Sequence, residues 1–188
     1  LHKIRLENDE FYVMSPEDTF ISLALHQRRF GKILNLKYVC DAGILLEREN
    51  LDWDYIIKAA YEDRFRASLF FILAQVQIVL DKNLSKYLDA LHIPFWQRKS
   101  IFTIIKKYTY SSHKDFNLYY LYLVCHFLLY DRIGHSVLYI LKIPQEQFAK
   151  FYKLPLYAKQ TKLRYRIRFL YVFYRLIKDN LGKIFVHR

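Results

Sequence analysis

Two polar residues on consecutive predicted helices, His26 and Asp41, are the first candidates for chemistry. A short loop around Gly31 joins these helices, so both side chains face the same groove if the helices are antiparallel. The pair then has three possible roles: a buried polar pair that fixes helix packing, the lining of a substrate cleft, or general-base chemistry by His26. No nucleophile lies nearby in the sequence, so we assign no catalytic residue within this chain.

The second candidate is Asp52-Trp53-Asp54, which has the spacing of a metal-binding Asp-x-Asp pair. Such a pair needs a strand, because alternate side chains of a strand point to the same side. Here it falls at the start of a predicted helix, where Asp52 caps the backbone and Asp54 complements the helix dipole. We therefore expect no metal site. The sequence also contains no zinc-ligand spacing and no glycine-rich phosphate loop.

A basic segment near the C-terminus is the third candidate. The last predicted helix, residues 158–180, includes Arg164, Arg166, Arg168 and Arg175, and Tyr and Phe residues interleave with them. This pattern is typical of binding to RNA or another polyanion, through phosphate contacts and stacking. It also suits an anionic membrane surface, or a packing helix with a solvated basic face.

The charge of the chain supports an anionic partner. Residues 1–63 carry a net charge of −4, whereas residues 64–188 carry +16. Such asymmetry indicates either an anionic ligand or an acidic neighbouring domain. The longest uncharged run, Phe116–Tyr130, has fifteen residues. A span needs about 20, so we expect a buried helix and no transmembrane segment.

The elements that would position these residues are mainly helices. Only four Gly and four Pro occur in 188 residues, fewer turn residues than sandwiches or barrels need. We predict a mainly all-α fold, a multi-helix bundle with a small N-terminal β-hairpin over residues 2–14. Caps and apolar periodicity predict helices at about 16–30, 33–48, 53–62, 65–81, 84–91, 95–110, 117–131, 134–142, 145–152 and 158–180.

The two cysteines, Cys40 and Cys125, both lie in apolar helical patterns. We expect buried free thiols, as in a reducing compartment. The present N-terminus carries no signal peptide, so the expected location is cytoplasmic.

One stretch resembles a known family. The pattern consists of Ser15, Pro16, Glu17, Asp18, His26, Leu36, Asp41, Leu51, Asp52, Trp53 and Ala59. It resembles the helical half of the uncharacterised nucleotidyltransferase-like family, distant relatives of the aminoglycoside nucleotidyltransferases. The resemblance implies a parent protein that transfers a nucleotidyl group from a magnesium-bound nucleoside triphosphate to an acceptor. It places the helical part on the acceptor side of the cleft.

The chain departs from the family in one respect. The family's catalytic unit, a Gly-Ser followed by an Asp-x-Asp, precedes this region, and no Gly-Ser occurs here. Because the chain begins at Leu1, we interpret it as a fragment. We assign residues 1–14 to the sheet of a preceding catalytic domain, and residues 15–188 to one helical domain that is inactive alone and binds no cofactor itself. The rival interpretations are a non-catalytic polyanion-binding module and a protein-interaction bundle.

Overall fold

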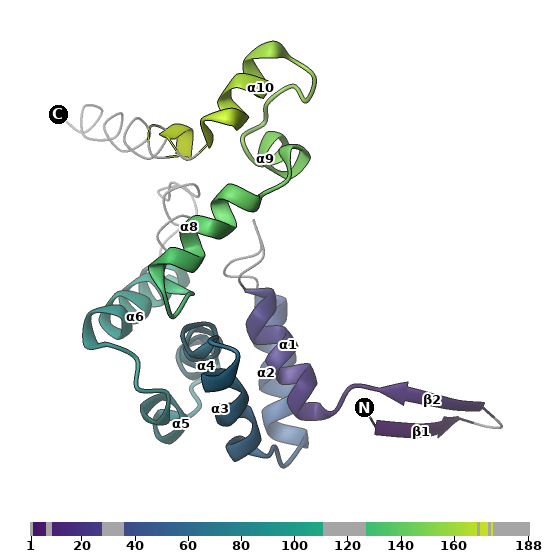
Figure 1. The fold of residues 1–188 in the computed structure, drawn as a ribbon. Coiled ribbons are helices and arrows are strands. Elements are labelled where there is room, and N and C mark those ends of the chain that lie inside the picture. Colours follow the sequence, from purple (N-terminus) through teal and green to yellow (C-terminus); the bar gives the residue numbers. More distant parts are fainter. Residues whose placement is uncertain are drawn as a thin grey trace. The chain divides into compact units, whose positions relative to one another are not determined.

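The computed structural model describes residues 2–6, 9–27, 36–110, 127–168, 170–172 and 174. Contacts between backbone positions divide the chain into two compact units, residues 1–110 and 111–188. This division differs from the boundary that we expected at residue 14, and the domain assignment stays a prediction. We describe each unit by itself. The mainly helical fold is confirmed (Figure 1).

The N-terminal unit begins with the predicted hairpin. Strands β1 (His2–Leu6) and β2 (Asp9–Val13) pair antiparallel, with His2 opposite Val13 and Leu6 opposite Asp9. Among the described residues the sheet consists of these two strands. The hairpin therefore gains no third strand from the described part of the chain.

Six helices follow among the described residues of the N-terminal unit. They are α1 (Pro16–His26), α2 (Leu36–Arg48), α3 (Trp53–Glu62), α4 (Arg66–Val79), α5 (Ser85–Ala90) and α6 (Phe95–Tyr110). The predicted bounds of α3 and α6 are confirmed. Their starts were readable because Asp52 caps α3 and Pro94 precedes α6.

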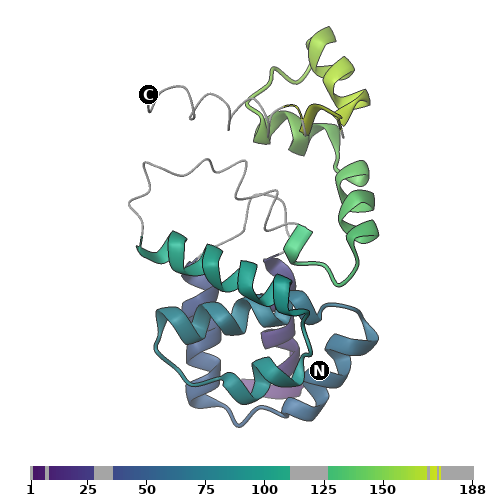
Figure 2. The same cartoon turned by 90° about the vertical axis from the view of Figure 1, so that its left-hand side faces the viewer.

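Helix α4 is the centre of this unit. Every residue from Ala67 to Val76 is buried, because the helix is apolar on all sides. It packs against α1, α2, α3, α5 and α6. Figures 1 and 2 show these helices arranged around it. Burial on every side makes α4 the scaffold that sets the positions of α1 and α2.

The second unit contains three described helices, α8 (Ile133–Lys142), α9 (Gln145–Phe151) and α10 (Lys159–Arg166). Helix α10 packs on α9 through an aromatic cluster, in which the Phe148 ring lies 5.7 Å from Tyr171 and 5.8 Å from Tyr165. A Tyr152–Tyr171 pair at 5.2 Å extends the cluster. Aromatic side chains therefore form the core between α9 and α10 in the described part of this unit.

Two features depart from the sequence-based predictions. Helix α10 ends at Arg166, and Ile167 leaves helical geometry before residues 168, 170–172 and 174 resume it, so the helix predicted over 158–180 is interrupted. Cys40 is exposed, not buried, because α2 turns Val39, Ala42 and Gly43 toward the core. Among the described residues, no helix has the length and apolar character needed to cross a bilayer.

Cys125 and most of the run Phe116–Tyr130 lie outside the described residues, as do the loop around Gly31 and Arg175.

Candidate functional site

His26 is the last residue of α1, and its ring is fixed by two helices. Its Nδ1 lies 2.8 Å from the carbonyl oxygen of Ser22. A carbonyl can only accept, so Nδ1 is the donor in this contact, and Nε2 is the acceptor nitrogen of the neutral ring. The ring also meets Tyr38 of α2 edge to face, at 5.6 Å. His26 thus offers a proton acceptor whose orientation α1 and α2 jointly hold.

Asp41 lies on α2, and α1 packs against α2. Both His26 and Asp41 are half-buried. Within the described part of the chain, no hydrogen bond or ion pair joins the two side chains. The predicted placement on neighbouring helices is therefore found, but a direct polar pair is not. Their role as cleft residues stays a prediction.

A third residue at this end of α1, Gln27, was not singled out from the sequence. It is completely buried, and neither its amide oxygen nor its amide nitrogen has a partner among the described residues. A buried polar group without a partner costs about 1–3 kcal/mol. Such a group favours the binding of water or a polar ligand. No signal in the sequence identifies Gln27 as a candidate, because only the packing of the folded chain buries its amide without a hydrogen-bond partner.

Asp52 and Asp54 lie at the start of α3, as the sequence predicted. The Asp52 carboxylate accepts the backbone N–H of Tyr55 at 3.0 Å, as an N-cap of α3 does. Asp54 lies exposed on the first turn. The described residues contain no group of three or more His, Cys, Asp or Glu side chains close enough together to bind one metal ion. These residues do not fit a magnesium ion, and the capping role is confirmed.

The first turns of α1 and α3 are tied together by hydrogen bonds. Ser15 caps α1 by accepting the N–H of Asp18 at 3.0 Å. The Glu17 carboxylate accepts the N–H of Asp52 at 3.1 Å, and the Asp18 carboxylate accepts the Tyr55 hydroxyl at 2.9 Å. Residues that resemble the family pattern thus join two helix starts.

These bonds also shift acidities. The N–H of Asp52 is the main reason why the pKa of Glu17 lies below its usual value. The bond to the Asp18 carboxylate, which would repel a phenolate, raises the pKa of Tyr55. Both shifts favour the states that make these hydrogen bonds at neutral pH, which are the ionised Glu17 carboxylate and the protonated Tyr55 hydroxyl.

Trp53 belongs to the same junction. Its ring stacks on Tyr87 of α5 at 3.8 Å and meets Phe20 of α1 edge to face at 5.7 Å. Trp53 is half-buried, and its two ring contacts join the start of α3 to α1 and α5.

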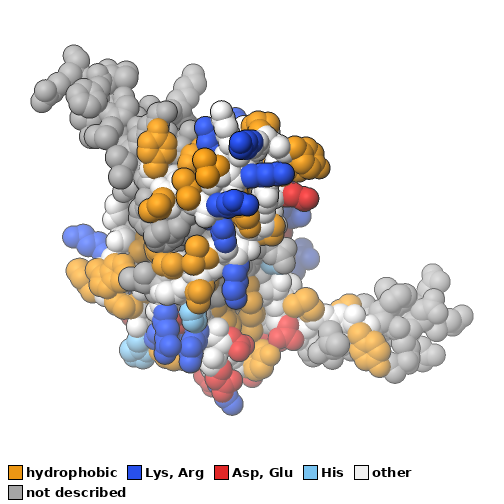
Figure 3. All heavy atoms as spheres, turned by 45° about the horizontal axis from the view of Figure 1, so that its top comes forward, with side chains coloured by type: hydrophobic (Ala, Val, Ile, Leu, Met, Phe, Trp, Pro, Cys, Tyr) orange, Lys and Arg blue, Asp and Glu red, His pale blue; other side chains and the backbone are white. Residues whose placement is uncertain are grey.

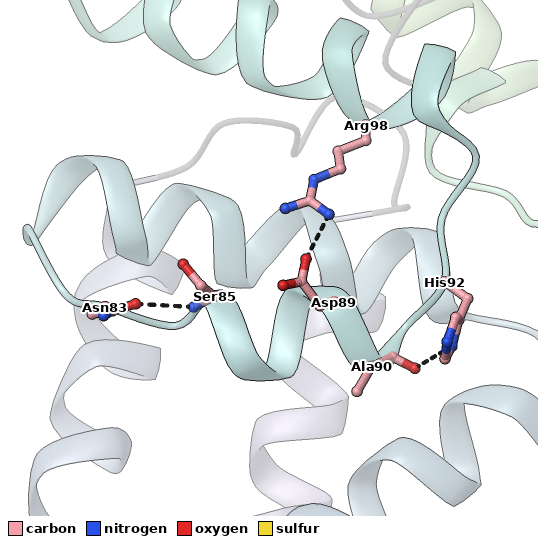
Figure 4. A network of polar contacts seen from close by, with 6 residues as sticks. All are labelled: Asn83, Ser85, Asp89, Ala90, His92 and Arg98. Atoms are coloured by element: carbon pink, nitrogen blue, oxygen red, sulfur yellow. Dashed lines mark hydrogen bonds and ion pairs between the residues drawn. The ribbon is translucent and has the colours of Figure 1, made fainter.

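The loop between α5 and α6 contains an exposed histidine, His92 (Figure 4). Its Nδ1 lies 2.9 Å from the Ala90 carbonyl and 2.8 Å from the Tyr61 hydroxyl. Its backbone adopts φ = 46°, the left-handed geometry that ends a helix. Nearby, Arg98 and Asp89 form an ion pair at 2.6 Å. These contacts fasten α5 to its neighbours, which is a structural role.

Three of the four arginines proposed for polyanion binding are described. Arg166 is exposed at the end of α10, and Arg164 is half-buried, with its guanidinium 5.5 Å from the Tyr171 ring. Arg168 differs, because its Nε and Nη2 donate to the carbonyl of Leu141 and its Nη1 donates to that of Tyr165. Arg168 therefore satisfies carbonyls near the ends of α8 and α10.

Comparison with known proteins adds one finding. Residues 1–81 match the model of a family described as an uncharacterised nucleotidyltransferase. This N-terminal part is nucleotidyltransferase-like. The nucleotidyltransferase-like part extends from β1 through α4, and it contains the α1–α3 junction, His26 and Asp41. The resemblance to an uncharacterised nucleotidyltransferase family is confirmed over this range, and the relation to the aminoglycoside nucleotidyltransferases stays a prediction.

Helices α5 to α10 lie outside the match. No curated protein and no solved structure matches the chain significantly.

Proposed function

We propose that the nucleotidyltransferase-like part forms the acceptor side of a nucleotidyl-transfer site. The single observation that carries this proposal is the family match over residues 1–81. The end of α1 supports it, because it combines an oriented proton acceptor, Nε2 of His26, with the unpartnered buried amide of Gln27. The hydroxyl or amine of an acceptor substrate can donate hydrogen bonds to such groups and accept hydrogen bonds from them.

The residues of this chain would bind and orient the acceptor. His26 would take the proton of an acceptor hydroxyl, and Asp41 would line the cleft from α2. The family resemblance implies magnesium and a nucleoside triphosphate, but Asp52 serves as the N-cap of α3 and no Gly-Ser occurs in the 188 residues. The catalytic unit would thus be supplied from outside this chain.

Two measurements test this proposal. The 188-residue chain, incubated with magnesium, nucleoside triphosphates and a panel of hydroxylated and amino compounds, should release no pyrophosphate. In ¹H–¹⁵N NMR spectra, an acceptor should perturb the end of α1 and the facing part of α2. His26→Ala should abolish these shifts, whereas His92→Ala, which removes an exposed histidine of the same unit, should not. Release of pyrophosphate by this chain would contradict the proposal. An equal loss of the NMR shifts in the His26→Ala and His92→Ala variants would also contradict it.

A second candidate function belongs to residues 111–188, which hold 14 Lys and Arg against 4 Asp and Glu. This unit would bind a polyanion through Arg164 and Arg166, with Arg168 holding the ends of α8 and α10 in place. Released counterions would make such binding weaken steeply with salt. Heparin and RNA titrations at rising salt test it, and absence of binding at low salt would contradict it.

A further inference from the structure

Two adjacent aromatic side chains at the start of α6 are exposed to solvent. Phe95 is 79% exposed and Trp96 is 57% exposed. Within the described part of the chain, neither ring contacts another aromatic ring or a cation. Figures 1 and 2 show α6 at the outside of the N-terminal unit. Exposed apolar side chains that lie together indicate an interaction site.

The rest of the exposed side of α6 is polar and basic. Because α6 is one uninterrupted helix, a turn of about 100° per residue places its exposed side chains within an arc of about 100°. These side chains are Phe95, Trp96, Lys99, Thr103 and Lys106. The helix contains four Lys and Arg residues and no Asp or Glu. Two rings in the first turn are thus followed by two exposed cations, over about 16 Å of the helix axis.

The opposite side of α6 faces the core of the N-terminal unit. Gln97, Ile101 and Ile105 are buried there. Beside them, the Arg98 guanidinium lies 2.6 Å from the carboxylate of Asp89 and 5.8 Å from the ring of Phe70 (Figure 4). These contacts fix the rotation of α6 about its axis. Packing therefore determines that the aromatic and basic side points outward.

We propose that this side of α6 binds single-stranded nucleic acid. Unpaired bases stack on Phe95 and Trp96, and phosphates contact Lys99 and Lys106, which is the combination that single-strand-binding surfaces use. Figure 3 shows more Lys and Arg than Asp and Glu side chains on the face that it draws, so phosphates are attracted to the molecule. The inference goes beyond the proposed function, because α6 lies outside the matched residues 1–81. It is also independent of the second candidate function, which belongs to residues 111–188.

Two other anionic partners fit this surface less well. The bases of a duplex are already stacked on one another, so a duplex would contact the cations and leave Phe95 and Trp96 without partners. A helix that lies in a bilayer interface needs an apolar side along its whole length. Beyond its first turn, the exposed side of α6 consists of Lys99, Thr103 and Lys106, which would have to enter the lipid.

The first experiment follows tryptophan fluorescence while the 188-residue chain is titrated with oligouridine. Stacking on a base should quench Trp96, whereas Trp53, the second tryptophan of the chain, should keep its emission. Trp96→Phe should abolish the quenching but retain the affinity, because a phenyl ring can also stack. Oligothymidine should bind as well, since stacking and phosphate contacts do not involve the ribose 2′-hydroxyl. Failure of both oligonucleotides to bind would overturn the proposal.

The second experiment measures affinity by fluorescence anisotropy of labelled oligouridine. Phe95→Ala combined with Trp96→Ala should weaken binding by on the order of tenfold or more, because the stacking of two bases is lost. Tyr12→Ala is the matched control, since it removes a ring of β2 that is 69% exposed, and it should leave the affinity unchanged. Lys99→Gln should flatten the dependence of affinity on salt.

Heparin, which is anionic but has no bases, separates the possible failures. The double aromatic variant should bind heparin as the native chain does, and its thermal midpoint should be unchanged. Binding of oligouridine without quenching of Trp96, or with equal affinity in the double variant, would overturn this inference and leave the second candidate function standing. A blue shift of Trp96 on phosphatidylcholine–phosphatidylserine vesicles, without quenching by oligouridine, would overturn it in favour of a membrane. A double variant that loses thermal stability would show that other residues cover the rings, and would also overturn it.

Discussion

The Glu17 carboxylate accepts a hydrogen bond from the backbone N–H of Asp52 at 3.1 Å, across 35 residues of sequence. One acid at the start of α1 thereby satisfies a backbone donor beside the start of α3, while its neighbour Asp18 holds Tyr55. The acidic first turn of α1 thus acts on two helices, and the junction is a structural feature of the nucleotidyltransferase-like part.

This bond predicts a pH dependence. The folded pKa of Glu17 lies below its usual value of 4.5, so the bond stabilises the fold above that value and is lost as the pH falls through the lowered pKa. Because the site is open to water, the contribution should be about 0.5 kcal/mol. Unfolding of the native chain and Glu17→Gln between neutral and acidic pH measures it. A difference between the two that does not shrink at acidic pH would argue against the bond.

Trp53 should matter far more than the other tryptophan. It lies between Phe20 and Tyr87, so Trp53→Ala removes two ring contacts and should cost about 3 kcal/mol in free energy of unfolding. Trp96 is 57% exposed on α6, and Trp96→Ala should cost less than about 0.5 kcal/mol. Urea unfolding monitored by circular dichroism gives both values. Equal losses would show that the Trp53 stack contributes little.

Gly43 marks the close approach of α2 to the end of α4. A Cβ at this position would clash with Cδ1 of Leu80. Gly43→Ala gains helix propensity of about 1 kcal/mol but must displace that methyl group, so the net change should be near zero.

In a Leu80→Ala background the methyl group is gone, and the same substitution should stabilise by about 0.5–1 kcal/mol. The double-mutant cycle measures the coupling between the two positions. A coupling energy of zero would show that α2 and Leu80 do not meet there.

Substitution of Arg168 should affect the stability of the fold, whereas substitution of Arg166 should affect polyanion binding. Arg168→Gln removes donors to the Leu141 and Tyr165 carbonyls and should lower stability by about 1–2 kcal/mol. Exposed Arg166→Gln should leave the thermal midpoint nearly unchanged.

In heparin titrations, the Arg166 variant should flatten the dependence of affinity on salt. A stable Arg168 variant, or an unstable Arg166 variant, would reverse this assignment. Substitution of Arg168 is consequently a poor probe of binding, because its effect on the fold would be mixed with any effect on the ligand.

The sequence by itself determined the helices whose signals are local. Ser15, Pro16 and Asp52 mark the starts of α1 and α3, and the end of α3 at Glu62 was also predicted, whereas α1 ends at His26, before the predicted residue 30. Caps act on amide groups within three residues, so a local pattern is sufficient to predict them. The residues that carry the family resemblance, Ser15 to Ala59, lie within the matched residues 1–81, and the small number of Gly and Pro predicted the mainly helical class.

Only the tertiary structure decided which groups meet across the chain. It gave Glu17 its partner at Asp52, turned Cys40 outward, buried Gln27 without a partner and bound Arg168 to Leu141. Each outcome depends on which side of a helix packs against a segment distant in sequence. Periodicity defines an apolar side, but the neighbour that covers it, and the polar groups left at its edge, are set by packing around α4 and within the α9–α10 cluster.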